Sequence, residues 1–291
     1  MKTKQNLDNE NTEMELITDS APVISAMERA SIDVQIATAK AYPRELSRVK
    51  SRMLSFATLD EETAAACFYT LPGRKGGDGK PIQGPSARLA EIAVACYGHI
   101  RAGSRVIAND GKTITAQAYC HDLENNVHIG LEVKRRITTR DGKTFSDDMQ
   151  VVVGNAACSI AFRNAVFKAI PGALIKPVYE AARKVAIGDT KTLASRRAAA
   201  VDYFLKMGVP KDRILSTLGV NNIEDIQLAH LETLTGLRTA IADGDTTVDE
   251  AFPAPAVPER PMFAKRPAPA DNVSAPAPAP AAEAGNEEVK L

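Results

Sequence analysis

The stretch that decides the fold is Gly98–Pro171. Its residues 100–136 read IRAGSRVIANDGKTITAQAYCHDLENNVHIGLEVKRR. Three segments alternate apolar and polar residues with the period of two that is typical of a strand with one buried face. Turn residues separate these segments at Asn109-Asp110-Gly111 and at Glu124-Asn125-Asn126. The pattern predicts three consecutive antiparallel strands, followed by a third turn at Arg140–Lys143 and a short extended piece.

The alternation predicts that the sheet has one apolar face and one charged face, because neighbouring side chains on a strand point to opposite sides. Ile114, Ala116, Ala118 and Cys120 fall on the apolar face. The other face carries Arg101, Arg105, Gln117, Tyr119, Lys134 and Arg136.

A helix is predicted from about Met149 to Ile170, rich in small residues and stopped by Pro171-Gly172. Polar and aromatic side chains gather near its end: Arg163, Asn164, Phe167 and Lys168. If the helix packs beside the sheet, these side chains and the charged strand face could line one groove.

The remaining segments predict flanking helices and an α+β fold. Helical periodicity covers Val23–Leu59 with an interruption at Pro43, and further helices are predicted at 60–67, 87–97 and 175–187. We expect a disordered leader (1–22), an α+β core (23–188), a small helical module (189–252) and a Pro/Ala-rich disordered tail (253–291). Within the module, helices are predicted at about 192–207, from Pro210 to Gly219, and at 230–242.

Composition and charge narrow the class of protein. The chain has 291 residues, 44% hydrophobic and 25% charged, which is typical of a globular protein. It has neither an apolar run of about 18 residues nor a secretory signal, so we expect a soluble cytoplasmic protein with its four cysteines reduced. The net charge of zero hides 26 basic and 17 acidic side chains in residues 21–200, an excess that favours a polyanionic partner.

Motifs for bond-breaking chemistry are weak or absent. The glycine-rich loop at 72–85 fails as a phosphate loop, because Arg74 replaces the first glycine and Pro81 the Ser/Thr. We interpret it as a hairpin tip, with contact to a nucleic-acid backbone as the less favoured alternative. Cys96 with His99, and Cys120 with His121, lack the spacing of a zinc site, so no metal or other cofactor is expected.

The basic residues form a set that suggests nucleic-acid binding. Lys134, Arg135, Arg136, Arg140 and Lys143 lie on or just beyond one hairpin, and Arg163 and Lys168 lie on the following helix. Such cations could follow a phosphate backbone while Tyr119 or Phe167 stacks on bases. The alternative is that they are ordinary surface charges and Phe167 belongs to the core.

Residues 25–188 resemble the phage single-strand annealing proteins of the RecT, Red-beta and Erf type, whose core is a β-β-β-α unit. The resemblance lies in the strands from His99 to Ile137, the turn at Arg140–Lys143, and the helix from Gly154 to Pro171. Phe68–Pro72 and Gly84–Glu91 resemble the helical part that precedes the sheet in such proteins.

The resemblance implies a non-enzymatic recombination protein of the bacterial host cytoplasm that binds single-stranded DNA and anneals complementary strands without ATP. It also implies rings or helical filaments, and an exonuclease or host single-strand binding protein as a partner of the C-terminal module or tail. Two alternatives stay open. One is a scaffold protein whose basic body meets an acidic partner, and the less favoured one is a magnesium nuclease that uses Glu132, Asp147 and Asp148.

Overall fold

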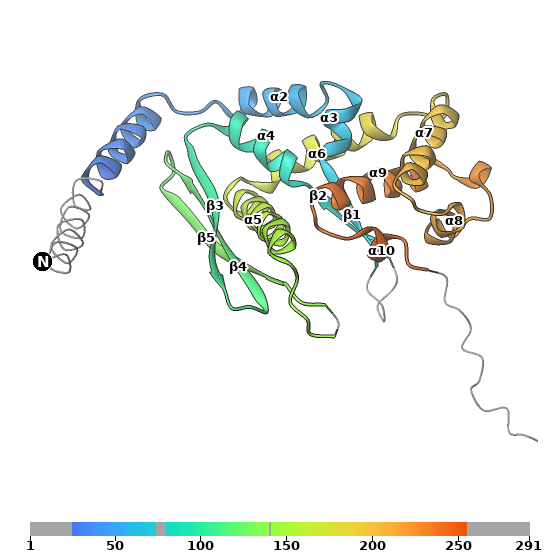
Figure 1. The fold of residues 1–291 in the computed structure, drawn as a ribbon. Coiled ribbons are helices and arrows are strands. Elements are labelled where there is room, and N and C mark those ends of the chain that lie inside the picture. The colour runs from blue at the N-terminus through green and yellow to red at the C-terminus, as the bar shows by residue number, and fades with distance from the viewer. Residues whose placement is uncertain (1–24, 74–79, 140, 255–291) are drawn as a thin grey trace, which may run out of the picture. The chain divides into compact units, whose positions relative to one another are not determined.

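Three antiparallel strands in the order β3-β4-β5 form the larger of two sheets in this mixed α+β chain (Figure 1). The computed structural model describes residues 25–73, 80–139 and 141–254. The strands are β3 (Ile100–Asn109), β4 (Thr113–Asp122) and β5 (Val127–Arg136). Gly111 (φ 78°) and Asn126 (φ 53°) allow the two tight connections, so the predicted meander is present.

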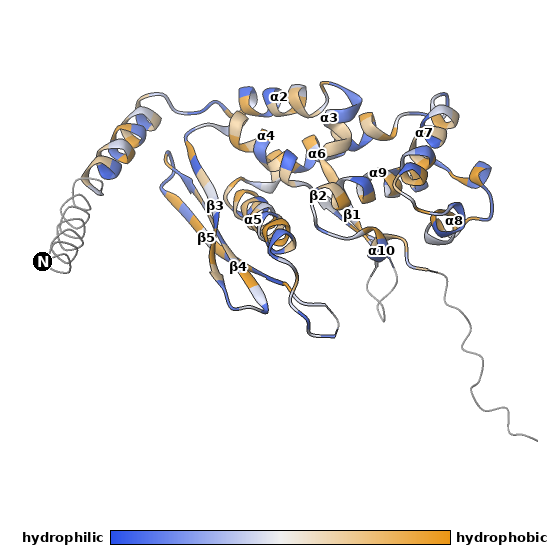
Figure 2. Cartoon of the chain, viewed as in Figure 1, coloured by the Kyte–Doolittle hydropathy of each residue, from blue (hydrophilic) through white to orange (hydrophobic). Residues whose placement is uncertain are grey.

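Helix α5 (Asp147–Ala169) covers the apolar face of this sheet. Its buried side is built from small residues, among them Ala157, Ala161 and Ala165, which pack with Ala116, Ala118 and Cys120 of β4. Small side chains let a helix lie close against a sheet. The hydropathy colouring of the strands alternates accordingly (Figure 2).

Two features of this region differ from the prediction. Helix α5 begins at Asp147 rather than Met149, because its first turn accepts two carboxylates at the positive end of the helix dipole. Strand β3 contains a bulge between Val106 and Ala108, where the pairing register with β4 shifts. Thr138 and Thr144 pair across the third turn as an isolated bridge.

The segment Phe68–Pro72, expected to be helical from the family resemblance, is instead a strand. Strand β1 (Phe68–Leu71) pairs antiparallel with β2 (Ile82–Pro85), and the tip that joins them, residues 74–79, lies outside the described residues. Phe68 and Thr70 are buried while Tyr69 and Leu71 are partly exposed, the period of a strand.

Helices pack around both sheets. The helix over residues 25–41 precedes Pro43 and α2 follows it, as predicted. Asp60 caps α3 by accepting from the Thr63 amide, and Ser86 caps α4 by accepting from the Leu89 amide. The helices are α2 (Leu46–Ala57), α3 (Glu61–Ala66), α4 (Ala87–Tyr97) and α6 (Gly172–Ile187).

A second hydrophobic cluster lies in the C-terminal helices α7 (Leu193–Lys206), α8 (Lys211–Leu218), α9 (Leu228–Ala242) and α10 (Val248–Ala251). Phe204 and Phe252 meet at its centre with ring centroids 4.8 Å apart. Helix α10 has no counterpart in the sequence prediction. The chain divides into a unit at 1–255, which holds both clusters, and a second at 256–291 outside the described residues.

Helix α9 joins the two clusters, because it also packs on β1. The Thr239 hydroxyl donates to the Ala65 carbonyl oxygen at 3.0 Å. No helix within the described ranges is long and apolar enough to span a bilayer.

Helix α9 lies close against β1 at Gly236, which leads to a prediction. A Cβ at Gly236 would lie 2.1 Å from the Thr70 hydroxyl oxygen and 2.7 Å from the Thr70 backbone nitrogen. We expect Gly236→Ala to lower the free energy of unfolding by about 2 to 3 kcal/mol through overpacking. Denaturant unfolding measures this change.

Gly154 in α5 supplies the control, because a Cβ there would meet Val106 at an ordinary 3.5 Å. Both glycines are inside helices, so both alanine variants gain the same helix propensity, up to about 1 kcal/mol. Gly154→Ala should therefore be neutral or stabilising. Equal effects of the two substitutions would contradict the close approach of α9 to β1.

Candidate nucleic-acid interface

The face of the β3-β4-β5 sheet that points away from α5 carries five of the twelve predicted binding residues: Arg101, Arg105, Tyr119, Lys134 and Arg136. The pairing register puts Arg105 beside Gln117 and Glu132, Thr115 beside Lys134, and Thr113 beside Arg136. At the other end it puts Arg101 beside His121 and His128. We call this surface the outer face; its side chains are Arg101, Gly103, Arg105, Thr113, Thr115, Gln117, Tyr119, His121, His128, Gly130, Glu132, Lys134 and Arg136.

The basic residues of the outer face are spread along its whole length. Lys134 and Arg136 are exposed on β5, and the Arg105 guanidinium donates to the Gln117 side-chain oxygen at 3.3 Å. Arg101 donates to Gln35 of the helix 25–41 at 3.2 Å. From His128 to Arg136 the strand extends about 27 Å, since each residue advances about 3.4 Å. The face is thus long enough to follow a stretch of backbone phosphates.

Tyr119 lies at the middle of the outer face with 40% of its surface exposed. Its ring is nearly parallel to that of His128, with an interplanar angle of 19° and centroids 6.4 Å apart. His128 in turn meets His121 edge-on at 5.5 Å. Neither histidine was predicted as part of a binding face, and His121 was considered only with Cys120 as a metal ligand. A lone histidine on a strand carries no signal until its cross-strand partners are known.

The predicted single groove between this face and the end of α5 is not formed. Helix α5 packs on the apolar face, so Arg163, Asn164, Phe167 and Lys168 lie on the other side of the sheet from Lys134. Phe167 packs against the hydrophobic core, and Asn164 is half-buried. Lys168 is exposed, but away from the outer face.

Arg163 is committed to an ion pair inside the protein. Its guanidinium lies 2.8 Å from an Asp245 carboxylate oxygen, with the two side chains 11% and 4% exposed. It also lies 4.5 Å from the centroid of the Tyr69 ring. Burial and the charge of Asp245 raise the pKa of neighbouring Asp243. Arg163 therefore compensates a buried acidic site and is a structural residue, which corrects its assignment to DNA.

This difference between the two helix cations is testable. Arg163→Ala should lower the free energy of unfolding by about 3 kcal/mol, because it leaves Asp245 buried without its partner. Lys168→Ala should change it by less than about 0.5 kcal/mol, as for an ordinary surface position. Thermal unfolding of the two single variants measures both values. A destabilisation by Lys168→Ala as large as that by Arg163→Ala would contradict these placements.

Two other candidate residues, Arg135 and Lys143, lie away from the centre of the outer face. Arg135 pairs with Ile114 and so points to the α5 side, where it is half-buried. Lys143 is exposed in the third turn, where its carbonyl accepts from the Thr139 amide at 2.8 Å. Arg140 falls outside the described residues.

The carboxylates of the nuclease alternative are not brought together. Glu132 is on the outer face, whereas Asp147 and Asp148 begin α5 on the opposite side. Among residues 25–73, 80–139 and 141–254, no three His, Cys, Asp or Glu side chains are grouped to hold a metal. The aspartates are in a helical turn, not on the extended segment that their sequence position suggested.

The cysteines are buried or half-buried free thiols. Burial raises the pKa of Cys67 to about 12 and that of Cys120, together with the charge of Asp122, to about 11. These two thiols stay protonated at neutral pH and are poor nucleophiles. Cys120 and His121 also point to opposite faces of β4, so they do not share a ligand site.

A buried ion pair that the sequence did not reveal ties Pro43 and its neighbours to the sheet. Both terminal nitrogens of Arg44 reach the Asp122 carboxylate, at 2.8 and 2.6 Å, with the side chains 4% and 3% exposed. Glu124 lies 3.1 Å from the Arg44 Nε, and the His99 ring contacts the Tyr42 carbonyl oxygen at 2.8 Å. The pairing spans 78 residues, so only the folded chain shows it.

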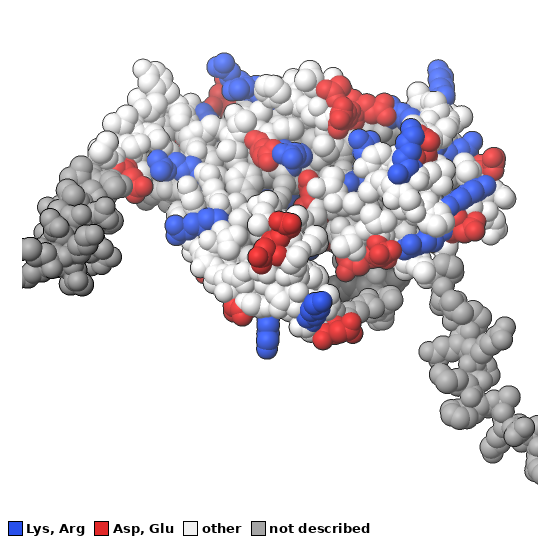
Figure 3. All heavy atoms as spheres, in the orientation of Figure 1, with Lys and Arg blue, Asp and Glu red and all other residues white. Residues whose placement is uncertain are grey.

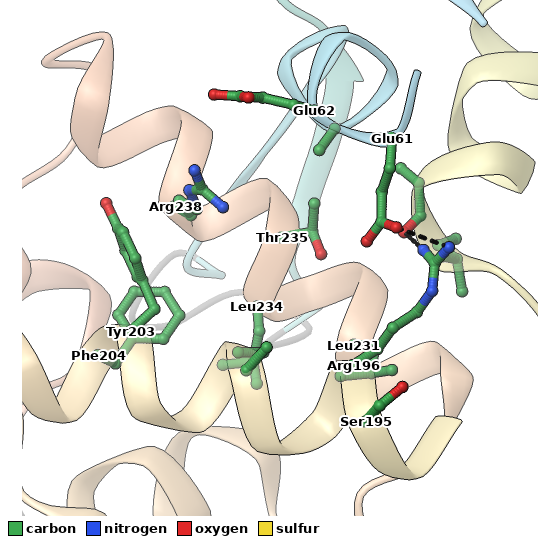
Figure 4. Close-up of a pocket in the computed structure, with 15 residues that line it drawn as sticks. Glu61, Glu62, Ser195, Arg196, Tyr203, Phe204, Leu231, Leu234, Thr235 and Arg238 are labelled. Atoms are coloured by element: carbon green, nitrogen blue, oxygen red, sulfur yellow. Dashed lines mark hydrogen bonds and ion pairs between the residues drawn. The ribbon is translucent and has the colours of Figure 1, made fainter. Parts of the chain in front are cut away.

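A separate hollow of about 550 Å³ lies among α3, α6, α7 and α9 (Figure 4). Its wall includes Phe204, Leu231 and Leu234. The two arginines at its rim are already engaged, since Arg196 pairs with Glu61 at 2.9 Å and Arg238 lies over the Tyr203 ring. This hollow therefore has an apolar wall and no arginine free of a partner among the described residues that line it.

Charges of both signs are interspersed on the side of the molecule drawn in Figure 3. That side therefore offers no large surface of a single charge. The outer face combines exposed cations, among them Arg105, Lys134 and Arg136, with the exposed ring of Tyr119 on one surface of the sheet.

Comparison with protein-family models, with curated proteins and with solved structures finds no match for this chain. Inferences about function therefore rest on the geometry of the outer face.

Proposed function

We propose that this protein binds single-stranded DNA on the outer face of its β3-β4-β5 sheet and anneals complementary strands without ATP. The observation that carries this proposal is the combination of Arg101, Arg105, Lys134 and Arg136 with the exposed Tyr119 ring on one open face. Sequence-independent binding of single strands combines the same two elements, a cationic track and an aromatic platform.

The mechanism is physical. Cationic side chains neutralise phosphates and release counterions, which supplies most of the affinity. The base edges stay free, and a second strand held nearby can pair with the first. Assembly into rings or filaments, expected from the resemblance to annealing proteins, would bring several outer faces to one DNA strand. A role for the C-terminal helices or tail in binding an exonuclease or a host single-strand binding protein belongs to the same proposal.

The experiment uses the full chain, a labelled oligonucleotide and its complement, without ATP. We expect binding by fluorescence anisotropy at low salt and faster annealing of the two strands. With four phosphate contacts, the plot of log affinity against log salt should have a slope of about −3.

Three results would contradict the proposal. Absence of binding at low salt would exclude it outright. Indifference to oligonucleotides together with a co-purifying acidic protein would favour the scaffold alternative, and degradation of the oligonucleotide on addition of Mg²⁺ would favour the nuclease.

A further inference from the structure

Tyr119 is the centre of an unusual row across the sheet, because both residues that pair with it are glycines. The register is Gly103, Tyr119, Gly130, from β3 through β4 to β5. Glycine weakens a strand and often marks a place where another group lies close to the backbone. The two glycines that flank the exposed Tyr119 ring therefore indicate that another group lies close to the backbone on each side of it.

The space above Gly103, where a side chain would lie, is filled by the Tyr119 ring. A Cβ at Gly103 would lie 3.1 Å from Tyr119 Cε1 and 3.2 Å from its hydroxyl oxygen. The ring thus leans over β3 at Gly103. Any side chain at position 103 would push the ring from this position.

Gly130, on the opposite side of Tyr119, is open. A Cβ there would meet only the Cε1 atom of His128, at 3.9 Å. A shallow hollow of about 610 Å³ lies over this glycine, lined by Gln117, Ala118, Tyr119, His128, Gly130, Leu131 and Glu132. The floor of the hollow is the backbone at Gly130, which has no side chain, and the rings of Tyr119 and His128 form part of its wall.

The shape and charge of the hollow fit a nucleobase and not a phosphate. The Tyr119 and His128 rings are 19° from parallel with centroids 6.4 Å apart, so each offers an aromatic surface on which a flat base can stack at the edge of the hollow. Glu132 in the wall repels a phosphate, but its carboxylate can accept a hydrogen bond from a base amino group. Arg101 and Lys134 lie on the outer face at either end of the hollow, where the phosphates of a strand would pass.

We propose that the hollow over Gly130 seats one unpaired nucleobase, stacked against Tyr119 and closed by His128. This inference rests on the proposed binding of single-stranded DNA, and it identifies the place where the protein contacts a base. Such a seat fixes the register of the strand on the outer face, and the neighbouring bases remain free to pair.

Two substitutions test the seat by removing the ring or filling the space. Tyr119→Ala should weaken oligonucleotide binding roughly 10-fold, while Tyr119→Phe should leave it nearly unchanged. Gly130→Val should produce a similar loss, because its side chain occupies the hollow without displacing backbone. Stacking involves no counterion, so the salt dependence of binding should keep its slope in these variants.

Fluorescence gives a direct readout, since the chain contains no tryptophan. Tyr119→Trp creates a single tryptophan, whose selectively excited emission should be quenched when an oligonucleotide is added and a base stacks on it. A matched Tyr42→Trp variant, on an exposed residue of the chain before Arg44, should not be quenched.

The outcomes separate the seat from the proposed function. If the wild-type protein binds DNA and Tyr119→Ala and Gly130→Val bind equally well, the seat is wrong and the DNA-binding function stands. A loss of affinity with a reduced salt slope would also overturn the seat, because the lost contacts would then be ionic. If the wild-type protein binds no DNA, the proposed function itself is wrong.

Discussion

Replacing Asp122 with Asn should lower the free energy of unfolding by about 4 kcal/mol, because Arg44 is then left buried without its main counter-charge. Arg44 and Asp122 pair through two hydrogen bonds of 2.8 and 2.6 Å, and Asn125 donates to the same carboxylate at 2.7 Å. Thermal unfolding should shift down by roughly 10 °C for a chain of this size.

The ion pair of Arg44 and Asp122 also makes the free energy of unfolding depend on pH. Burial would raise the pKa of Asp122, but the hydrogen bonds from Arg44 and Asn125 outweigh burial and hold the pKa at about 2. A carboxylate with a depressed pKa stabilises the fold above its unfolded value near 4 and loses that contribution as the pH falls through its folded value. The wild-type protein should therefore lose about 2 kcal/mol from this group between pH 4 and pH 2, and Asp122→Asn should show a flatter profile.

The control is Asp110→Asn, at the opposite end of the sheet. Asp110 accepts hydrogen bonds from the Lys112 and Thr113 amides and also has a lowered pKa, but it is exposed. It has no buried cation as its partner, so its replacement should cost far less. If both variants unfolded at the same temperature, the buried ion pair would not contribute the stability that we expect of it.

A triple variant of the outer face should have the largest effect on DNA binding. We expect Arg105→Gln, Lys134→Gln and Arg136→Gln together to weaken binding of a single-stranded oligonucleotide roughly 100-fold at 0.1 M salt. Each lost phosphate contact should also reduce the log–log salt slope by about 0.7, so the slope should fall by about 2.

A charge-matched control separates local contacts from overall charge. Lys168→Gln, Lys176→Gln and Lys206→Gln remove three exposed cations that lie away from the outer face. The ion pairs of Lys176 and Lys206 are exposed i,i+4 pairs, so their loss costs little stability. Similar losses of affinity in the two triple variants would show that binding does not depend on the outer face.

The strands and their faces were accessible from the sequence because the period of two is a local property. Ile114, Ala116 and Ala118 are buried and Lys134 and Arg136 exposed, as the alternation predicts. The helix caps at Asp60 and Ser86 were equally local. The loop at 72–85 was interpreted as a hairpin tip, and strands β1 and β2 at its two ends do pair antiparallel. The strands themselves were not predicted because each has four residues, too few for a clear period.

The prediction that the charged strand face and the end of α5 line one groove was wrong, and the sequence pattern accounts for this. A helix rich in alanine must bury its small side chains, and the apolar face of the sheet needed a cover, so α5 had to lie opposite the charged face. The partners of Arg163 and Arg44 were beyond reach, since Asp245 and Asp122 are 82 and 78 residues away along the chain. Long-range ion pairs leave no local pattern, and they decide which cations stay free for a ligand.

The central claim is that single-stranded DNA lies on the outer face and not at the end of α5, and lysine protection tests it most directly. Lys134 and Lys168 are both exposed and lie on opposite sides of the sheet. The protein would be acetylated with and without a saturating oligonucleotide at low salt, and modification of each lysine measured by mass spectrometry. We predict strong protection of Lys134 and none of Lys168; protection of Lys168 alone, or of neither lysine, would contradict the claim.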